Sequence, residues 1–345
     1  MSESDINKIE ENEIQEGGYR VLGCIGKGSY GTVYKALDTC GNTYAIKAVE
    51  FSKMRHKTMR FNSTTDEFTI STILSKECLK GNADYIGIVK IYNVFRTDQR
   101  YYIVMELLDG QTLEDFVQTP TGTEKDYLNE DTFKQIAFQI LSGLSFLGSL
   151  NIAHRDIKPD NIFIKRRPGS SGYEVKIIDI GLGRISEERP YVDMWGRREC
   201  MRSSVGTPLY ASPEIEFCNG YTKRCDLWSA GMTLYYLATG TDLVAADPAT
   251  YRHEKKRVWE ECGKEGFRFR AVYSDEINGL LGKMMARRGP SAKEILGDIW
   301  LGAGGGGCAP LAKREEEPRV IDLVKECQRS CVQDFKGFNA IPLEQ

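Results

Sequence analysis

The stretch HRDIKPDN, residues 154–161, holds the residues with the most specific chemistry in this 345-residue chain. A carboxylate such as that of Asp156 can accept a hydroxyl proton, and the side-chain oxygen of Asn161 is a ligand that magnesium accepts. Asp179, 18 residues after Asn161, offers a second hard oxygen ligand. The chain has only three histidines, so a chance His-Arg-Asp-x-x-x-x-Asn is expected fewer than ~0.001 times.

A glycine-rich stretch, GKGSYG at 26–31, is compatible with two kinds of phosphate site. A dinucleotide-binding fold would need a helix directly after the glycines, to point its N-terminus at a pyrophosphate. The residues that follow, TVYKAL, favour a strand instead. We therefore expect a hairpin whose backbone N–H groups close over phosphates, and we exclude a dinucleotide-binding fold. Lys47, 16 residues past Gly31, can reach such phosphates as a point charge.

These residues need two kinds of scaffold. Runs rich in β-branched and aromatic residues predict five strands: YRVLGCIG, GTVYKALD, NTYAIKAVEF, IVKIYNVF and RYYIVMELL. After Leu108 the pattern becomes helical, as in 131–150, where apolar residues recur every three or four positions: Phe133, Ile136, Ala137, Ile140, Leu141 and Leu144. The segment LWSAGMTLYYLATG reads as a buried core helix. A β-rich small lobe thus precedes a helix-rich larger lobe, with the joint near 106–111.

In order along the chain, GKGSYGTV, AIK, HRDIKPDN, DIG and SPE (212–214) resemble the signature set of eukaryotic protein kinases. Lys158 and the Gly206-Thr207-Pro208 stretch are similar to the serine/threonine branch, and GTPLYASPE is similar to NIMA-related kinases. The resemblance implies an α+β bilobal protein-kinase fold. Its small antiparallel β-sheet N-lobe, with one main helix, would span about 19–106. Its larger, mostly helical C-lobe would span about 111–302.

The resemblance also implies a role for each matching residue. The loop over the ATP phosphates would contain Ile25, Gly26, Lys27, Gly28, Ser29 and Gly31. The adenine would meet a roof, a gatekeeper, a hinge and a floor, formed by Val33, Ala45, Met105, Glu106, Leu108 and Phe163. Lys47 would hold the α- and β-phosphates, Asp156 would be the catalytic base, and Lys158 would contact the γ-phosphate. Asn161 and Asp179 would bind Mg²⁺, and Asp226 would brace the His-Arg-Asp backbone.

Two departures from the family pattern bear on activity. The helix after Lys47 should supply a glutamate partner, but the family register puts Ile70 there, with Glu67 one turn earlier on the same helical face. We predict that Glu67 is the partner. Asp179-Ile180-Gly181 stands where the family has Asp-Phe-Gly. Since isoleucine keeps much of the volume and the apolar character of phenylalanine, we expect looser packing rather than lost chemistry.

The sequence also suggests a regulatory phosphorylation site and a substrate preference. Ser203, or the adjacent Ser204, is a candidate autophosphorylation site whose phosphate would pair with Arg155. Gly289 replaces the arginine that usually pairs with the Ser-Pro-Glu glutamate, which leaves a Glu214–Arg288 pair as the alternative. Asp160 would favour a basic residue in the protein substrate. Tyr236, where strongly basophilic kinases tend to have glutamate, makes that preference mild.

The composition limits the class of protein. A net charge of −3 provides no basic field, so we expect no nucleic-acid and no membrane partner. Ten cysteines without Cys-x-x-Cys pairs predict reduced, structural thiols. The N-terminus is polar and acidic, without the apolar run of a signal peptide, which predicts a cytoplasmic and alternatively a nuclear protein. Residues 1–18 read as a solvated acidic tail before a kinase domain at 19–302.

Two alternatives follow for function and two for the C-terminal part. Retention of Lys47, Asp156, Asn161 and Asp179 favours an active Ser/Thr kinase that uses ATP and Mg²⁺. The altered DIG and the displaced glutamate leave a pseudokinase, a nucleotide-binding scaffold, as the second hypothesis. The run GAGGGG opens a tether and tail at 303–345, where apolar residues spaced by three or four predict an amphipathic helix. That helix would dock on its own domain or bind a partner.

Overall fold

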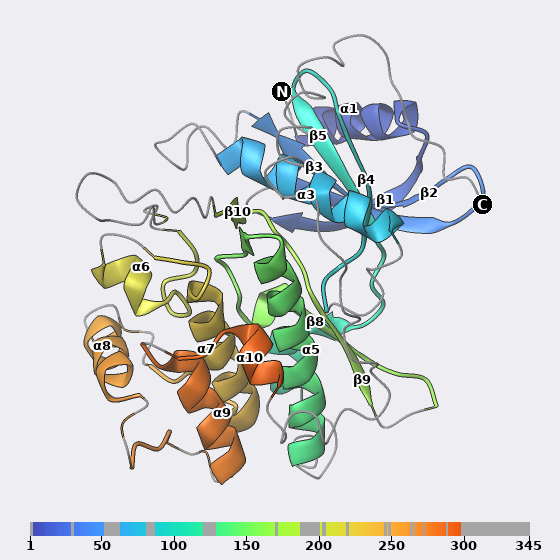
Figure 1. The fold of residues 1–345 in the computed structure, drawn as a ribbon. Helices are drawn as coiled ribbons and strands as arrows, with labels where there is room; N and C mark the ends of the chain where they lie inside the picture. The colour runs from blue at the N-terminus through green and yellow to red at the C-terminus, as the bar shows by residue number, and fades with distance from the viewer. Residues whose placement is uncertain are drawn as a thin grey trace. The chain divides into compact units, whose positions relative to one another are not determined.

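The computed structural model describes residues 3–28, 31–51, 63–80, 87–119, 129–169, 172–186, 201, 205–218, 221–244, 247, 250–262, 264, 266–270, 272, 274–287 and 289–297. They belong to two compact units (Figure 1). The first contains the described residues of Met1–Asp84 and Val89–Leu108, and the second those of Tyr85–Ile88 and Asp109–Lys313. The predicted tail at 303–345 lies outside the described residues.

The first unit is built on a five-stranded antiparallel sheet with the order β1-β2-β3-β5-β4. Its strands are β1 (Arg20–Gly28), β2 (Gly31–Leu37), β3 (Thr43–Glu50), β4 (Ile91–Arg96) and β5 (Arg100–Glu106). All five strands predicted from the β-branched and aromatic runs are confirmed. The turn from β2 to β3 contains Gly41 with a φ of 88°, which a glycine adopts without steric cost.

Side-chain alternation gives this sheet two different faces. One face carries an apolar cluster of Tyr34, Ala36, Tyr44, Ile46, Ala48, Tyr102 and Val104. The intervening residues, such as Lys47 and Tyr101, point to the opposite face, where helix α3 (Ser63–Leu79) supplies Glu67. The sheet therefore separates this apolar cluster from the face that carries Lys47 and Glu67.

The N-terminal segment corrects one prediction. Residues expected to form a solvated tail form helix α1 (Glu3–Glu16), in which Ile14 is fully buried in the apolar cluster and Glu10 is 3% exposed. The acidic side chains have partners on the sheet: Tyr34 donates to Glu10 Oε2 at 2.7 Å, and the Tyr102 hydroxyl donates to Glu13. Arg100 lies 3.6 Å from Glu10 and 3.5 Å from Glu13. Glutamates that look solvated in the sequence thus pair with residues far along the chain.

The second unit is mostly helical. Its long helix α5 (Glu130–Ser149) begins after Asn129, whose side chain accepts the Thr132 N–H, and every apolar residue of the predicted period is buried. Helix α7 (Cys225–Thr239) is buried along most of its length and ends at Gly240 with a φ of 70°, as the core-helix prediction requires. The other helices are α4 (Leu113–Gln118), α6 (Pro213–Phe217), α8 (Tyr251–Glu261), α9 (Asp275–Met285) and α10 (Ala292–Leu296).

Short strands precede and follow the segment 154–161 in this unit. Strands β6 (Gln111–Thr112), β8 (Ile162–Arg166) and β9 (Tyr173–Ile177) form one sheet, and β7 (Ile152–Ala153) pairs with β10 (Arg184–Ile185). The 3₁₀ turn η3 (Pro159–Asn161) precedes β8. In the described part of the chain, no helix combines the length and the hydropathy needed to cross a membrane.

Candidate active site

Lys47 and Glu67 form a buried ion pair in the first unit. Lys47 Nζ lies 2.9 Å from Glu67 Oε1, with residue exposures of 8% and 1%. Strand β3 fixes the lysine, because Lys47 pairs with Val33 on one side and with Ile103 on the other. The predicted Glu67 partner is thus confirmed, and Ile70, at the family's usual glutamate position, is fully buried instead. The displaced glutamate, one of the two reasons for the pseudokinase hypothesis, thus still pairs with the lysine.

The glycine-rich stretch forms a hairpin, as predicted. Strands β1 and β2 pair from Arg20–Leu37 to Gly28–Gly31, so a strand and not a helix follows the glycines. At Gly31 a Cβ atom would lie 2.0 Å from the Ala48 carbonyl oxygen, which explains the need for glycine there. Ser29, predicted to belong to this loop, lies outside the described residues. The hairpin geometry excludes the dinucleotide-binding alternative.

The predicted adenine-binding residues of the first unit cluster around β3 and β5. Ala45 pairs with Met105 across these strands. The Glu106 N–H donates to the Lys90 carbonyl at 3.0 Å, and Glu106 Oε1 accepts the Lys90 N–H at 2.6 Å. These bonds fix the backbone just before Leu108, which is half-buried at the end of the unit.

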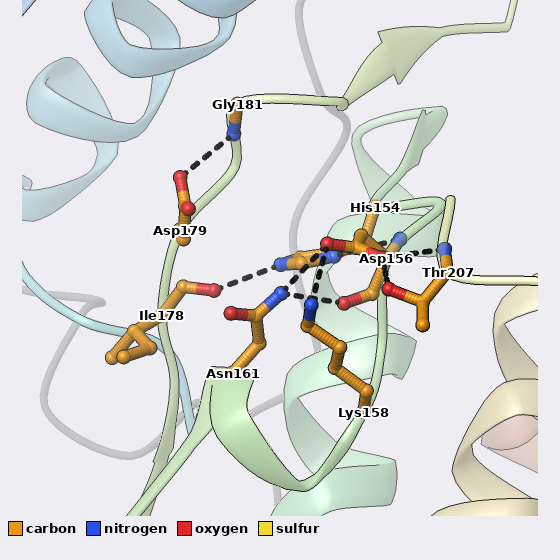
Figure 2. Close-up of polar contacts among 8 residues, drawn as sticks. All are labelled: His154, Asp156, Lys158, Asn161, Ile178, Asp179, Gly181 and Thr207. Carbon is orange, nitrogen blue, oxygen red and sulfur yellow. Dashed lines mark hydrogen bonds and ion pairs between the residues drawn. The ribbon is translucent and has the colours of Figure 1, made fainter. Parts of the chain in front are cut away.

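In the second unit, the carboxylate of Asp156 is held on both oxygens (Figure 2). Oδ1 accepts the Thr207 N–H at 3.0 Å and the Thr207 hydroxyl at 2.9 Å. Oδ2 accepts the Asn161 amide at 3.0 Å and lies 3.7 Å from Lys158 Nζ. Asp156, Lys158 and Asn161, predicted from one motif, therefore converge at one point, and Thr207 joins them from a distant segment.

His154 ties this loop to the strand that leads to Asp179. Its Nε2 lies 3.0 Å from the Ile178 carbonyl, and its Nδ1 lies 3.3 Å from the Asp156 N–H (Figure 2). A carbonyl only accepts and an N–H only donates, so in this arrangement Nε2 faces an acceptor and Nδ1 faces a donor. The buried imidazole therefore bridges the loop and the strand.

Asp226 holds the backbone of the loop at His154 and Arg155. Its Oδ2 accepts the His154 N–H and its Oδ1 the Arg155 N–H, both at 2.7 Å, as the predicted brace requires. Burial raises the pKa of the Asp226 carboxyl, while His154 and the two backbone donors oppose that rise. The carboxylate is thus fixed as an acceptor for two buried N–H groups.

Asn161 and Asp179 supply the oxygen atoms suited to a metal ion. The Asn161 Nδ2 donates to the Asp156 carbonyl at 2.8 Å, so the opposite side of the amide, its oxygen, is left to face a ligand. Asp179, with a φ of 58°, accepts the Gly181 N–H at 3.2 Å. Among the described residues, no group of three or more His, Cys, Asp or Glu side chains is arranged to hold a metal ion. One amide and one carboxylate fit Mg²⁺, which keeps several waters and binds substrate phosphates.

The altered DIG motif retains a packed apolar residue. Ile180 is 4% exposed, so the isoleucine is buried as expected for a substitute of phenylalanine. Phe163, the predicted floor, lies on β8 and pairs with Lys176 of β9. The segment after Gly181 runs into β10, while Ser203, Ser204 and Arg288 lie outside the described residues.

Arg155 has partners among the described residues, and two other arginines lie near enough to Glu214 for their charges to act on it. The Arg155 guanidinium donates to the Leu182 carbonyl at 2.7 Å and to the Tyr221 hydroxyl at 3.1 Å. Burial raises the pKa of Glu214, and the nearby charges of Arg224 and Arg287 oppose that rise. The charges of Arg224 and Arg287 thus act on Glu214, and the predicted Glu214–Arg288 pair stays a prediction.

Sequence reasoning missed two contacts of the site. The Gly-Thr-Pro motif gives no contact for Thr207, which donates to Asp156 in the structure. The strand pattern gives no partner for Tyr101, whose hydroxyl donates to Glu67 Oε2. A tyrosine at a buried strand position is a signal that its hydroxyl has a partner, but the sequence does not say which one.

Comparisons with known proteins agree with this geometry. Residues 19–301 match the family described as protein kinase domain. A probable serine/threonine-protein kinase of Dictyostelium discoideum is 33% identical over 277 residues, covering 78% of this chain and 41% of the relative. A probable myosin light chain kinase of the same organism is 28% identical over 302 residues, which cover 83% of this chain and 87% of the relative. Calcium-dependent protein kinase 6 of Plasmodium berghei is 31% identical over 221 residues, which cover 64% of this chain and 13% of the relative.

The chain therefore spans only part of some of these relatives, about two fifths of the first. The match covers most of the chain and includes both the Lys47–Glu67 pair and the Asp156 loop. The chain belongs to the protein kinase domain family.

Proposed function

We propose that this chain is a protein serine/threonine kinase that transfers the γ-phosphate of ATP to hydroxyl groups of protein substrates. One observation carries the proposal: a carboxylate, Asp156, fixed by Asn161, Lys158 and Thr207. A base held in this way can orient an acceptor hydroxyl and take its proton. The family uses ATP, and one of the relatives is named a probable serine/threonine-protein kinase.

The residues divide the work of phosphoryl transfer. Lys47, which pairs with Glu67, would hold the α- and β-phosphates as a point charge, and Lys158, which lies next to Asp156, would contact the γ-phosphate. Mg²⁺, held by Asn161 and Asp179, would neutralise charge on the phosphate oxygens. Catalysis would thus come from positioning and from charge rather than from a covalent intermediate.

The substrate preference that we propose is a mild one for a basic residue near the acceptor. Asp160 is exposed beside the catalytic loop, and its charge, like that of Asp242, acts on the half-buried Glu114. Burial, then these two charges, raise the pKa of Glu114, while a hydrogen bond from Tyr236 opposes the rise. Peptides with arginine before the acceptor should have a higher kcat/KM than the same peptides with glutamate there. Asp160→Asn should reduce this difference in kcat/KM.

The test of the proposal is transfer of labelled phosphate from ATP and magnesium to a generic protein, followed by identification of the modified amino acid. Phosphoserine and phosphothreonine are the expected products. Phosphotyrosine alone, or no protein-bound phosphate, would contradict the proposal. Autophosphorylation at Ser203 or Ser204 and a cytoplasmic or nuclear location stay predictions from the sequence.

A further inference from the structure

The Glu67 carboxylate has a second buried donor besides Lys47. Lys47 Nζ donates to Oε1 at 2.9 Å, and the Tyr101 hydroxyl donates to Oε2. Tyr101 is fully buried and Glu67 is 1% exposed, so both bonds lie away from solvent. Each carboxylate oxygen thus has its own partner from the sheet, one on β3 and one on β5.

We infer that Tyr101 is a positioning residue for phosphoryl transfer, because it fixes the Glu67 carboxylate that orients Lys47. The inference rests on the proposed kinase function. Glu67 has three side-chain torsions, and a single ion pair leaves the carboxylate free to turn about its last bond. A second donor on the other oxygen removes that freedom and fixes the direction in which Oε1 meets the lysine.

The tyrosine itself is rigidly held. Strand β5 lies between β3 and β4, and Tyr101 pairs with Val49 on one side and with Arg96 on the other. Its ring meets the ring of Phe51 at 5.5 Å and that of Phe68 edge-on at 5.8 Å. Phe68 follows Glu67 on α3, so the same ring that carries the hydroxyl also packs against the helix that carries the carboxylate.

The residue next to Tyr101 provides an internal control. Tyr102 points to the opposite face of the sheet, where its hydroxyl donates to Glu13 of α1. Both tyrosines are fully buried, lie on the same strand and donate to a glutamate. They differ in the glutamate that they serve: Glu67 contacts Lys47, whereas Glu13 contacts Arg100. Removing either hydroxyl therefore separates a general effect on the sheet from an effect on the lysine.

The test compares Tyr101→Phe with Tyr102→Phe in the full chain. We expect Tyr101→Phe to lower kcat/KM for ATP about tenfold, the effect of losing one hydrogen bond to a charged group. We expect Tyr102→Phe to lower the melting temperature and to leave kcat/KM within about twofold. Equal losses of kcat/KM in both variants, or none in either, would overturn the inference.

A double variant tests whether Tyr101 acts through Glu67. In a Glu67→Met background, which removes the acceptor and keeps a similar volume, Tyr101→Phe should cause no further loss of kcat/KM. A full additional tenfold loss would show that Tyr101 acts elsewhere. If the double variant does not fold, the comparison of the two tyrosine variants decides alone.

Measuring ATP binding tests this inference independently of the proposed kinase activity. The dissociation constant for ATP with magnesium, measured by calorimetry on the wild type, Tyr101→Phe and Tyr102→Phe, does not require phosphate transfer. A wild type that binds ATP and transfers nothing would contradict the kinase proposal. In that case weaker binding by Tyr101→Phe alone would still support the positioning role, and equal binding by all three proteins would overturn it.

Discussion

Asp226 Oδ1 accepts the backbone N–H of Arg155 at 2.7 Å, and Arg155 has a φ of 67°, in the left-handed region. A bulky residue adopts this conformation only at a cost of about 1–2 kcal/mol, so the surrounding bonds must hold it there. Asp226 also holds His154, and the chain then turns to present the Asp156 carboxylate. A buried carboxylate in the core helix α7 thus holds the backbone of the loop that carries Asp156.

Asp226→Ala should destabilise the protein by about 2–5 kcal/mol, because it leaves two buried N–H groups without an acceptor. Phosphate transfer should fall as well, since Asp156 loses its support. The free energy of unfolding in denaturant measures the first effect. Asp131→Ala is the matched control, because Asp131 is exposed in the first turn of α5 and should change stability by less than about 1 kcal/mol. Similar losses in both variants would contradict the bracing role.

Gly206→Ala should disturb the contact between Thr207 and Asp156. Gly206 has a φ of 98°, and a Cβ there would lie 2.5 Å from the Arg155 carbonyl oxygen. The strain should cost about 1–3 kcal/mol and move the Thr207 donors, so kcat should fall. Gly279→Ala, in helix α9 with no atom within 4 Å of the added Cβ, should be neutral or stabilising by up to about 1 kcal/mol. An unchanged kcat in Gly206→Ala would show that Thr207 is not needed.

Ile14→Ala tests whether helix α1 is part of the first unit. Ile14 is fully buried against the sheet, so truncation should cost about 2–5 kcal/mol of unfolding free energy. Leu22→Ala, at a position that is 47% exposed on β1, should cost less than about 1 kcal/mol. Denaturant unfolding of both variants decides the question: equal small effects would mean that residues 3–16 behave as the solvated tail that the sequence suggested.

Tyr44→Phe should change the dependence of stability on alkaline pH. Burial, and then the hydrogen bond to Asp38, raise the pKa of Tyr44 to about 12 from its usual 10.0. Between these values the unfolded chain has lost the proton and the native protein retains it, so the free energy of unfolding falls as the pH rises. For one group the slope is about −1.4 kcal/mol per pH unit. The difference in unfolding free energy between wild type and Tyr44→Phe should therefore shrink between pH 10.0 and about 12. A difference that stays constant over this pH range would contradict the raised pKa.

The sequence predicted what depends on local pattern. Alternation identified the five strands, the glycine spacing with a strand after it identified the hairpin, and the helical face of Glu67 identified the partner of Lys47. Each of these inferences needs only the residue types within a short window or one helical turn. The motif at 154–161 predicted that Asp156, Lys158 and Asn161 lie close together for the same reason, because they are within a few residues of one another in the sequence.

Contacts between distant segments were beyond the sequence. Helix α1 looked solvated because its glutamates find Tyr34, Arg100 and Tyr102 only when the sheet has formed. Thr207 reaches Asp156 across 51 residues, and Tyr101 reaches Glu67 across 34. Such pairs follow from the tertiary packing of buried polar groups, which must find partners but do not specify them in advance.

We propose above all that Asp156 enables phosphate transfer to a protein hydroxyl. The most direct measurement is the rate of transfer from ATP with magnesium by the wild type, by Asp156→Asn, which keeps the volume and removes the base, and by the surface control Asp131→Asn. We expect transfer by the wild type and the control, with at least a ~100-fold loss in Asp156→Asn while ATP still binds. Equal transfer by all three proteins, or none by the wild type, would contradict the account.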